Sequence, residues 1–362
     1  MKLSELLSIN LLEEMIHDGY IVRRWHRDWD LAILNYTDKA QFENEWNPVT
    51  RQCRGLIVRY DDDFQDAEII ARPFPKFFNY GQPGADEIGM DEEAWVSDKM
   101  DGSLGIAYVT PDGKLAIATR GSFHSEQAEW ATRWLHENLH PEDIEHMARW
   151  SISYTDLFEI VYPENRIVVD YGERAELVYL ASVHTCTGDT SRFSPSAVPT
   201  PRAELLAGSL REALALEPRE NAEGVVVMTD DGRAVKLKQE DYLLKHRARF
   251  NLTPKRIWEA IVANITLHDF LEGMPDEFHD AIGKAWHEIE DKGLEYASAC
   301  AGWANQARLE GDRKAQAAYI QLRHPDKAAG IFAALDGDMV KLTRAAAKYM
   351  EPTGPEASQL IA

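Results

Sequence analysis

The sequence has 362 residues, of which 44% are hydrophobic and 10% aromatic, with ten tryptophans. This composition excludes a wholly disordered chain, and the length predicts a large domain of roughly 250 residues plus a smaller one. The net charge of −22 excludes a protein that coats nucleic acid with its whole surface, because phosphate binding requires clustered Lys and Arg.

Neither export nor membrane insertion is indicated. The first residues, MKLSELLSINLLEEMIHDG, carry acids early and lack the basic and uninterrupted apolar zones of a secretory signal. No stretch approaches the ~20 apolar residues that cross a bilayer. Cys53, Cys186 and Cys300 are far apart and odd in number, which indicates neither a disulfide framework nor a zinc cluster. We therefore expect a cytoplasmic protein with reduced thiols and no membrane partner.

The first 250 residues are dominated by the alternating or apolar runs of β-strands. An amphipathic helix opens the chain, and helical spacing returns at 125–138. Turn residues at Pro111-Asp112-Gly113 and Asp230-Asp231-Gly232 predict two hairpins. The predicted strands cover residues 20–24, 31–36, 55–60, 67–71, 94–98, 105–109, 114–119, 154–161, 167–171, 177–183, 224–228 and 234–237.

The pattern changes near residue 250. Thr253 is suited to cap a helix with Pro254 at its first position, and alanine-rich helical spacing continues to about residue 350. Pro352, Gly354 and Pro355 then predict a frayed tail. We therefore expect an α+β fold. Residues 1–250 would form a domain of antiparallel sheets with flanking helices, and residues 251–362 an all-α domain.

The most informative local segment is VSDKMDGSLG, at residues 96–105. It places Lys99 at the end of a strand beside a glycine turn, and Gly102 would let the backbone pass close to a nucleotide. A lysine attacks phosphorus only when its amine is unprotonated, so burial or nearby cations must lower its pKa. This segment is weak evidence when taken alone, because a surface lysine beside an Asp-Gly turn is common.

Further segments strengthen this interpretation. Glu159 and Glu223 each lie in or beside an apolar strand, where a carboxylate needs a partner or ligand. Lys236 and Lys238 share one strand face, a spacing suited to holding phosphate oxygens. Residues 233–256 contain eight Lys or Arg and two acids, which predicts a confined polyanion site.

The ordered segments KMDGS, FEIV, EGVVV and VKLK resemble the motifs of the covalent nucleotidyltransferase superfamily of ATP-dependent ligases and RNA capping enzymes. The runs RQCRG, RPFPKFFN and PENRIV look like the bacteriophage RNA ligase 1 family, and the resemblance covers about residues 30–250. It implies an adenylation domain that joins RNA 3′-hydroxyl and 5′-phosphate ends, in RNA (tRNA) repair, through a lysyl-AMP and an RNA-adenylate.

The resemblance also implies roles for individual residues. Lys99 would be the nucleophile, and Glu159 would contact the nucleoside sugar. Glu223 would support a metal or the geometry of the lysine. The nucleotide and its phosphates would be held by Tyr36, Arg54, Lys76, Gly102, Arg120, Lys236 and Lys238. Arg120 stands where the family often has lysine, which keeps the charge but changes its geometry. Asp269 would correspond to a metal ligand.

Some of these residues have ordinary alternatives. Arg54 and Lys76 could be surface salt-bridge partners, Tyr36 a core aromatic, and Asp269 a solvated helix residue. His184 and Cys186 are best explained as structural. The tryptophans and tyrosines after residue 251 are typical of packing rather than of base stacking.

The implied chemistry requires ATP and a divalent ion. Mg²⁺ is the natural choice, with Mn²⁺ as an alternative, because Mg²⁺ binds phosphate and carboxylate oxygens while retaining waters. We expect a monomer. The competing interpretations are a capping guanylyltransferase or DNA ligase, both of which usually append an OB-fold, and a catalytically silent RNA-binding relative. In the family, the C-terminal domain is associated with tRNA recognition, but residues 251–362 match it poorly, so their role in recognising RNA stays open.

Overall fold

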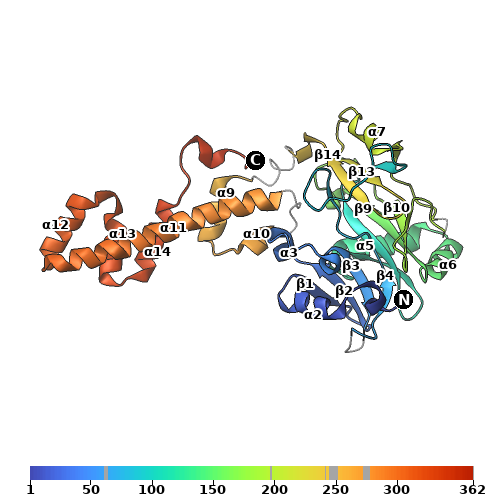
Figure 1. The fold of residues 1–362 in the computed structure, drawn as a ribbon, viewed down its shortest axis with the longest axis horizontal. Coiled ribbons are helices and arrows are strands. Elements are labelled where there is room, and N and C mark those ends of the chain that lie inside the picture. Colours follow the sequence, from blue (N-terminus) through green and yellow to red (C-terminus); the bar gives the residue numbers. More distant parts are fainter. Residues whose placement is uncertain (61–63, 196–197, 241, 244–251, 272–277, 362) are drawn as a thin grey trace. The chain divides into compact units, whose positions relative to one another are not determined.

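The computed structural model describes residues 1–60, 64–195, 198–240, 242–243, 252–271 and 278–361. The chain divides into two compact units, Met1–His246 and Arg247–Ala362. The first is α+β with three mainly antiparallel sheets, and the second is helical (Figure 1). In the described residues, no helix has both the length and the apolarity to span a bilayer.

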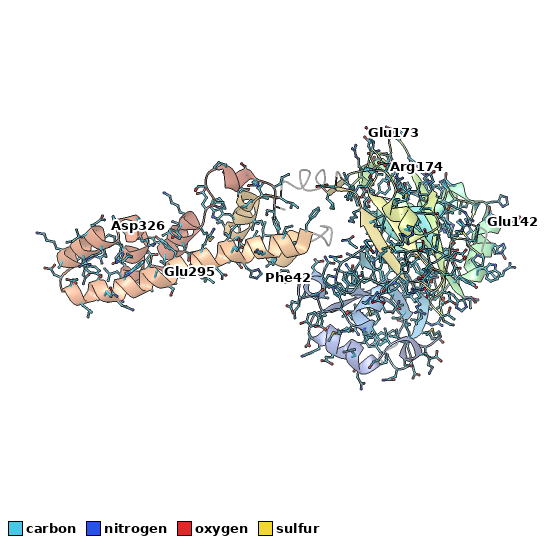
Figure 2. All side chains as sticks on the ribbon, turned by 45° about the horizontal axis from the view of Figure 1, so that its top comes forward. Phe42, Glu142, Glu173, Arg174, Glu295 and Asp326 are labelled. Atoms are coloured by element: carbon cyan, nitrogen blue, oxygen red, sulfur yellow. The ribbon has the colours of Figure 1, made fainter. Side chains whose placement is uncertain are left out.

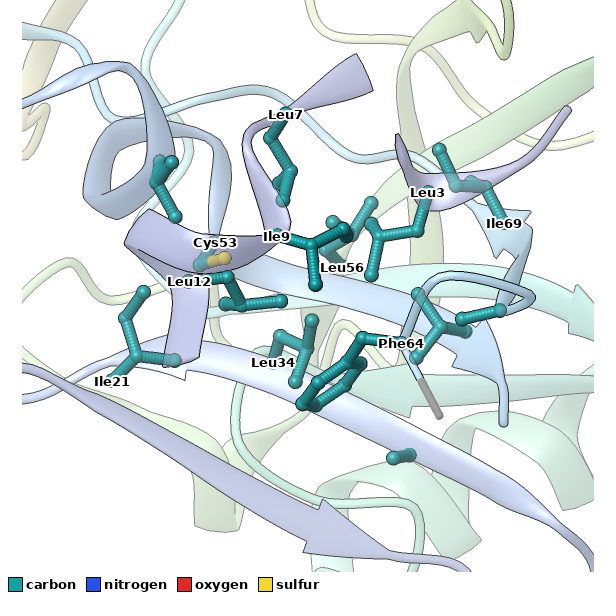
Figure 3. Packing of buried hydrophobic residues seen from close by; sticks show 14 of the residues in the cluster. Leu3, Leu7, Ile9, Leu12, Ile21, Leu34, Cys53, Leu56, Phe64 and Ile69 are labelled. Atoms are coloured by element: carbon teal, nitrogen blue, oxygen red, sulfur yellow. The ribbon is translucent and has the colours of Figure 1, made fainter. Parts of the chain in front are cut away.

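The first sheet has four antiparallel strands packed under short helices. Its strands run in the order β1 (Ile21–Trp25), β2 (Leu31–Tyr36), β3 (Arg54–Arg59) and β4 (Glu68–Ala71). The N-terminal helices α1 (Leu3–Leu6) and α2 (Ile9–His17) cover one face, where Leu12, Leu34, Leu56 and Phe64 form a closed core (Figure 3). Between β2 and β3 lie α3 (Asp38–Phe42) and α4 (Pro48–Gln52).

The second sheet has five strands in the order β11 (Thr190–Ser191), β10 (Glu176–His184), β9 (Tyr154–Val161), β7 (Ser103–Val109) and β8 (Leu115–Thr119). Helices α5 (Glu126–Asn138) and α6 (Pro141–Trp150) cover one face through a shared apolar cluster. Ser125 caps α5 by accepting a hydrogen bond from the Ala128 backbone N–H. Glu142 on α6 projects at the periphery of this unit (Figure 2).

The third sheet positions the three lysines predicted for the site: Lys99 directly follows one of its strands, and Lys236 and Lys238 lie on another. Its order is β12 (Leu205–Ala207), β6 (Trp95–Asp98), β13 (Gly224–Met228), β14 (Ala234–Lys238) and β5 (Phe78–Asn79), the last parallel to β14. Helix α7 (Leu210–Leu214) packs on one face. A small apolar cluster joins Met100, which follows β6, to Val161 of β9 and Val178 of β10.

The second unit is built from helices. They are α9 (Pro254–Val262), α10 (Leu267–Leu271), α11 (His279–Ala307), α12 (Arg313–Arg323), α13 (Ala328–Asp336) and α14 (Met339–Tyr349), with 3₁₀ turns η3 (Arg308–Glu310), η4 (Pro325–Lys327) and η5 (Pro355–Ser358). Its core includes Tyr296, Ile320 and Ile331. Thr253 caps α9 by accepting from the Arg256 backbone N–H, with Pro254 at the first position, which confirms that prediction.

Most predicted elements are confirmed, and two are wrong. The tail predicted to fray forms the turn η5, and the Ile361 backbone N–H donates to the Leu252 carbonyl at 2.8 Å. Gly113 and Gly232 have φ of +85° and +88°, and both sit in the predicted hairpin turns. Residues 167–171, predicted as a strand, form none. There the backbone N–H groups of Val168 and Val169 bind the Asp101 carboxylate instead of a neighbouring strand, after the 3₁₀ turn η1 (Pro163–Asn165).

Candidate active site

The loop from Lys99 to Gly102 joins β6 to β7, which belong to different sheets. The Lys99 backbone N–H donates to the Gly224 carbonyl at 3.0 Å, which ties the loop to β13. A Cβ atom at Gly102 would lie 2.5 Å from the carbonyl oxygen of Ile160 on β9. The glycine is therefore required by the close passage of two backbones, a tighter constraint than the nucleotide contact expected from the sequence.

One buried carboxylate holds two lysines. Glu223 Oε2 lies 2.7 Å from Lys99 Nζ, and Glu223 Oε1 lies 3.0 Å from Lys238 Nζ. The Glu223 side chain is 3% exposed, whereas Lys99 keeps 21% of its side chain exposed, so its amine is reachable. The register of β13 with β14, which pairs Gly224 with Lys238, brings these groups together.

An arginine fixes the residue before Lys99. Arg219 Nη2 lies 2.7 Å from Asp98 Oδ1 and donates to the Gly224 carbonyl at 3.0 Å. The Gln239 side chain accepts from the Arg219 backbone N–H at 2.5 Å and donates to the Ala222 carbonyl at 2.9 Å. The turn that carries Glu223 is thus held from both sides.

Glu159 on β9 faces the same cluster. Its Oε1 accepts from the Gly102 backbone N–H at 3.0 Å. Burial raises the pKa of Glu159 to about 8; Lys99 opposes the rise, while the negative charges of Glu223 and Asp101 add to it. The carboxyl is therefore largely protonated at neutral pH and able to donate a hydrogen bond, for example to a sugar hydroxyl.

Asp101 and Tyr242 are site residues that the sequence analysis missed. Asp101 is 2% exposed, and its Oδ2 accepts from the Val168 and Val169 backbone N–H groups, each at 2.7 Å. Its Oδ1 accepts from the Tyr242 hydroxyl at 2.8 Å, and its own N–H donates to the Tyr171 hydroxyl at 2.8 Å. The only sequence signal was the aspartate inside KMDGS, since both tyrosines are distant in the chain.

Tyr36, Arg54 and Arg120 form a second group. Arg120 Nη1 donates to the Tyr36 hydroxyl at 2.8 Å. Burial lowers the pKa of Arg54; Tyr36 and Glu159 raise it and Arg120 lowers it, so Arg54 lies near all three residues. Arg54 Nη1 is buried without a hydrogen-bond partner among the described residues. A donor in that position suits an anionic ligand.

Lys76 is buried in a box of rings. Its side chain is 3% exposed, and its Nζ lies 5.3 Å from the Tyr36 ring centroid, 4.9 Å from that of Trp46 and 5.4 Å from that of Phe78. Lys76 is therefore not the surface salt-bridge partner considered as an alternative. Tyr36 is likewise more than a core aromatic, since it contacts both Arg120 and Lys76.

Phe77 joins the two groups. Its ring centroid lies 5.0 Å from Lys236 Nζ and 5.8 Å from Arg54 Cζ. Lys236 therefore points toward the arginine group, while Lys238, two residues along β14, reaches Glu223. Ten of the eleven residues expected from the sequence thus lie in the first unit, around the junction of its sheets.

The eleventh, Asp269, lies in the second unit. Its carboxylate accepts from the Thr266 hydroxyl at 2.7 Å at the start of α10, a local helix-end contact. Its role as a metal ligand stays a prediction. Among the described residues, no group of three His, Cys, Asp or Glu side chains forms a ready metal cage. The Glu223 carboxylate, beside Lys99 and Lys238, is the group of this cluster that suits a divalent ion shared with substrate phosphates.

Among the described residues of the basic segment 233–256 in the first unit, Lys236 and Lys238 lie in the site and Arg233 does not. Arg233 pairs with Asp231 at 2.8 Å and with Glu92, at the opposite end of β14 from Lys238. Arg256 belongs to α9 of the second unit. Lys245, Arg247 and Arg249 lie outside the described residues, so only Lys236 and Lys238 of this segment are placed in the site.

The region that contains most of these site residues is also the region that matches known proteins. Residues 52–249 match a family model described as RNA ligase. RNA ligase 1 of Bacteriophage TS2126 is 29% identical over 153 residues, which cover 38% of this chain and 35% of that protein. A protein of Autographa californica nuclear polyhedrosis virus, whose name couples a polynucleotide kinase with an RNA ligase, is 28% identical over 184 residues, 45% of this chain and 25% of that protein. The chain thus spans about a quarter to a third of these relatives.

Among solved structures, an archaeal ATP-dependent RNA ligase is similar with a TM-score of 0.48 and 14% identity. The match covers 81% of this chain and 80% of that chain.

Proposed function

The chain belongs to the RNA ligase family, whose model matches more than half of it, and from this membership we propose that it is an ATP-dependent RNA ligase acting through Lys99. The observation that carries the proposal is the Lys99–Glu223–Lys238 arrangement, in which an accessible amine is fixed beside a carboxylate and a second cation. The names of relatives that include RNA ligase support the same substrate class.

In the first step, Lys99 Nζ would attack the α-phosphorus of ATP. A nitrogen–phosphorus bond forms, the bond to the β-phosphate oxygen breaks, and pyrophosphate leaves. The amine has to give up a proton before this attack, and the Glu223 carboxylate at 2.7 Å is placed to receive it. Lys238, Lys236 and Arg54 would stabilise the negative charge that develops on the phosphates.

Two further steps would complete ligation. An RNA 5′-phosphate oxygen attacks the AMP phosphorus, the nitrogen–phosphorus bond breaks, and Lys99 is released as an amine. A 3′-hydroxyl then attacks the RNA 5′-phosphorus and displaces AMP. Glu159, protonated at neutral pH, would donate a hydrogen bond to the nucleoside sugar throughout.

Glu223 would hold a divalent ion together with the nucleotide phosphates; we propose Mg²⁺, with Mn²⁺ as a substitute. The ion would supply charge neutralisation on the phosphates when bound. Glu223 fits this role because its carboxylate oxygens lie beside Lys99 and Lys238, where the phosphates would bind. We propose that the active form is a cytoplasmic monomer.

We also propose that the second unit contributes to RNA recognition. Helices α12 and α14 each carry three Lys or Arg and no Asp or Glu, in a chain whose net charge is −22. Such helices suit phosphate contacts. Neutralising Lys341, Arg344 and Lys348 together should weaken RNA binding and reduce its salt dependence, while adduct formation with ATP stays unchanged.

The test is adduct formation with radiolabelled ATP and, separately, GTP. We expect a labelled protein with ATP that is lost in Lys99→Ala and kept in Lys114→Ala, a lysine whose side chain is 75% exposed on the hairpin after β7. An adduct with GTP alone would support a capping enzyme instead. Retention of the ATP adduct in Lys99→Ala would remove this nucleophile, and absence of any adduct would favour a silent RNA-binding relative.

A further inference from the structure

A small cavity lies between the second and third sheets, outside the cluster around Lys99. Its walls include Trp95 and Ser97 of β6, Leu180 of β10, and Leu205 of β12, and its volume is about 220 Å³. Ser97 is two residues before Lys99, about 7 Å of extended chain. The cavity is therefore next to the strand that carries the nucleophile, and its size suits one nucleobase with part of its sugar rather than a larger ligand.

Arg192 and Arg202 are the only charged residues among those that line this cavity. In the described part of the chain, neither guanidinium has a carboxylate partner within ion-pair distance, unlike Arg211, Arg219 and Arg233. The cavity therefore carries two positive charges and no carboxylate in its lining. Their donors are suited to an anion brought by a ligand.

The two arginines are held by rings and backbone instead. Arg192 Cζ lies 4.5 Å from the Phe193 ring centroid, and Arg202 Cζ lies 5.1 Å from the Tyr179 centroid and 5.7 Å from that of Phe193. Arg202 Nη1 donates to the Arg192 carbonyl at 2.8 Å. The backbone on both sides of Arg202 pairs with Tyr179, at 2.7 and 3.1 Å, so its position is set by the sheet.

Phe193 supplies a flat apolar surface at the same place. It is 60% exposed, although a large aromatic side chain normally gains by burial. An exposed ring flanked by two guanidinium groups is the combination that binds single-stranded nucleic acid, since bases stack on the ring and phosphates bind the arginines. A double helix would not fit a cavity of this size.

We propose that this cavity binds one nucleotide of the RNA strand, with its base on Phe193 and its phosphate on Arg192 and Arg202. The proposal rests on the proposed function, and it assigns the cavity to the RNA rather than to ATP. A wider groove of about 1010 Å³ adjoins the cavity and shares Arg192 and Phe193 with it. The rest of that groove is lined by five carboxylates and Arg233, so this part repels a polyanion. The strand would therefore run from the cavity toward Lys99 and not along that groove.

The first experiment measures binding of a fluorescent, 5′-phosphorylated single-stranded oligoribonucleotide to the full chain by anisotropy. Phe193→Ala should weaken binding by about 5- to 150-fold, the range expected when one base no longer stacks, and Phe193→Trp should preserve it. In the double variant Arg192→Gln, Arg202→Gln, the slope of log affinity against log salt should become less steep. Its magnitude should fall by about 0.7 for each phosphate that the protein no longer binds. Arg133→Gln on α5 and Ile152→Ala, at exposed positions, are matched controls that should change neither quantity.

The second experiment separates RNA binding from the ATP reaction. With Phe193→Ala, formation of the ATP adduct should match the wild type within twofold, which also shows that the variant is folded. Transfer of AMP to RNA should be slow at low RNA concentration and recover at high concentration, because KM for RNA rises while kcat is kept.

Two results would overturn the proposal. One is unchanged RNA affinity and salt slope in the Phe193 and arginine variants, and the other is a loss of adduct formation with unchanged RNA affinity, which would assign the cavity to ATP. If the wild-type chain forms no adduct, the ligase function fails, yet the anisotropy experiment still decides whether the cavity binds RNA.

Discussion

Glu223→Gln tests the central arrangement of the site most directly. The amide has the shape of the carboxylate but no charge, so Lys99 and Lys238, at 2.7 and 3.0 Å from it, lose their shared counter-ion. Removing one partner of a buried ion pair costs about 3–5 kcal/mol. We take about 3 kcal/mol, the lower end, because Lys99 is 21% exposed and turns partly to water.

Two further variants give a ranking of stabilities that does not depend on the value of about 3 kcal/mol. Lys99→Met leaves Glu223 paired with Lys238, so its cost should be about 1 kcal/mol or less. Adding Lys99→Met to Glu223→Gln removes one of two facing ammonium groups, so the double variant should be more stable than Glu223→Gln alone. Both contrasts follow from one carboxylate serving two lysines.

The assay is thermal and urea unfolding of the purified chain at pH 7. For a unit of this size, 3 kcal/mol corresponds to a fall in Tm of about 6–12 °C, against about 2–4 °C for Lys99→Met. The reasoning is refuted if Glu223→Gln unfolds at the wild-type temperature, or if it is less destabilised than Lys99→Met.

Three further predictions concern the surroundings of the lysine. The pKa of Glu159 is about 8 in the folded chain, above its unfolded value near 4.5. Between pH 4.5 and 8 the folded chain therefore binds up to about one more proton than the unfolded chain. This group makes the free energy of unfolding fall as pH rises through that range. Glu159→Gln should remove that part of the slope in urea titrations at several pH values, and an identical slope in both proteins would contradict the assignment. Gly102→Ala should lower the free energy of unfolding by about 1–3 kcal/mol and impair adduct formation, because the new Cβ would lie 2.5 Å from the Ile160 carbonyl oxygen. Gly302→Ala, with open space around it, is the control and should be neutral or stabilising in the same unfolding assay. Tyr242→Phe removes the donor to buried Asp101 and should lower the unfolding free energy by about 1.5–3 kcal/mol; no change in Tm would show that this hydrogen bond is unimportant.

Local sequence signals predicted the elements that carry the site. The end of β6 at Asp98, the hairpin turns at Gly113 and Gly232, and the Thr253–Pro254 helix start all depend on residues within a few positions of one another. The strand predicted at 167–171 was wrong because a short apolar run such as Ile167–Val169 is also compatible with a loop. In the structure, that loop gives its backbone N–H groups to a carboxylate.

Local sequence signals could not predict contacts between residues that are far apart in the chain. Asp101 and Tyr242 are 141 positions apart, and no local pattern indicates that they meet. Arg233 shows the reverse error: it looked like part of a basic segment, but β14 runs in a direction that carries it away from Lys238 and into ion pairs with Asp231 and Glu92.

The sequence by itself determined that Lys99 ends a strand beside a glycine turn, that two glutamates accompany apolar strands, and that a helical region follows. These features depend on backbone preferences and on the alternation of apolar residues along the chain. Only the tertiary structure decided which groups share the site, because the pairing of β13 with β6 on one side and β14 on the other places Glu223 between two lysines. Hydrogen bonds and ion pairs act over a few ångströms of space, and the register of the sheets, rather than distance along the chain, sets who lies within that reach.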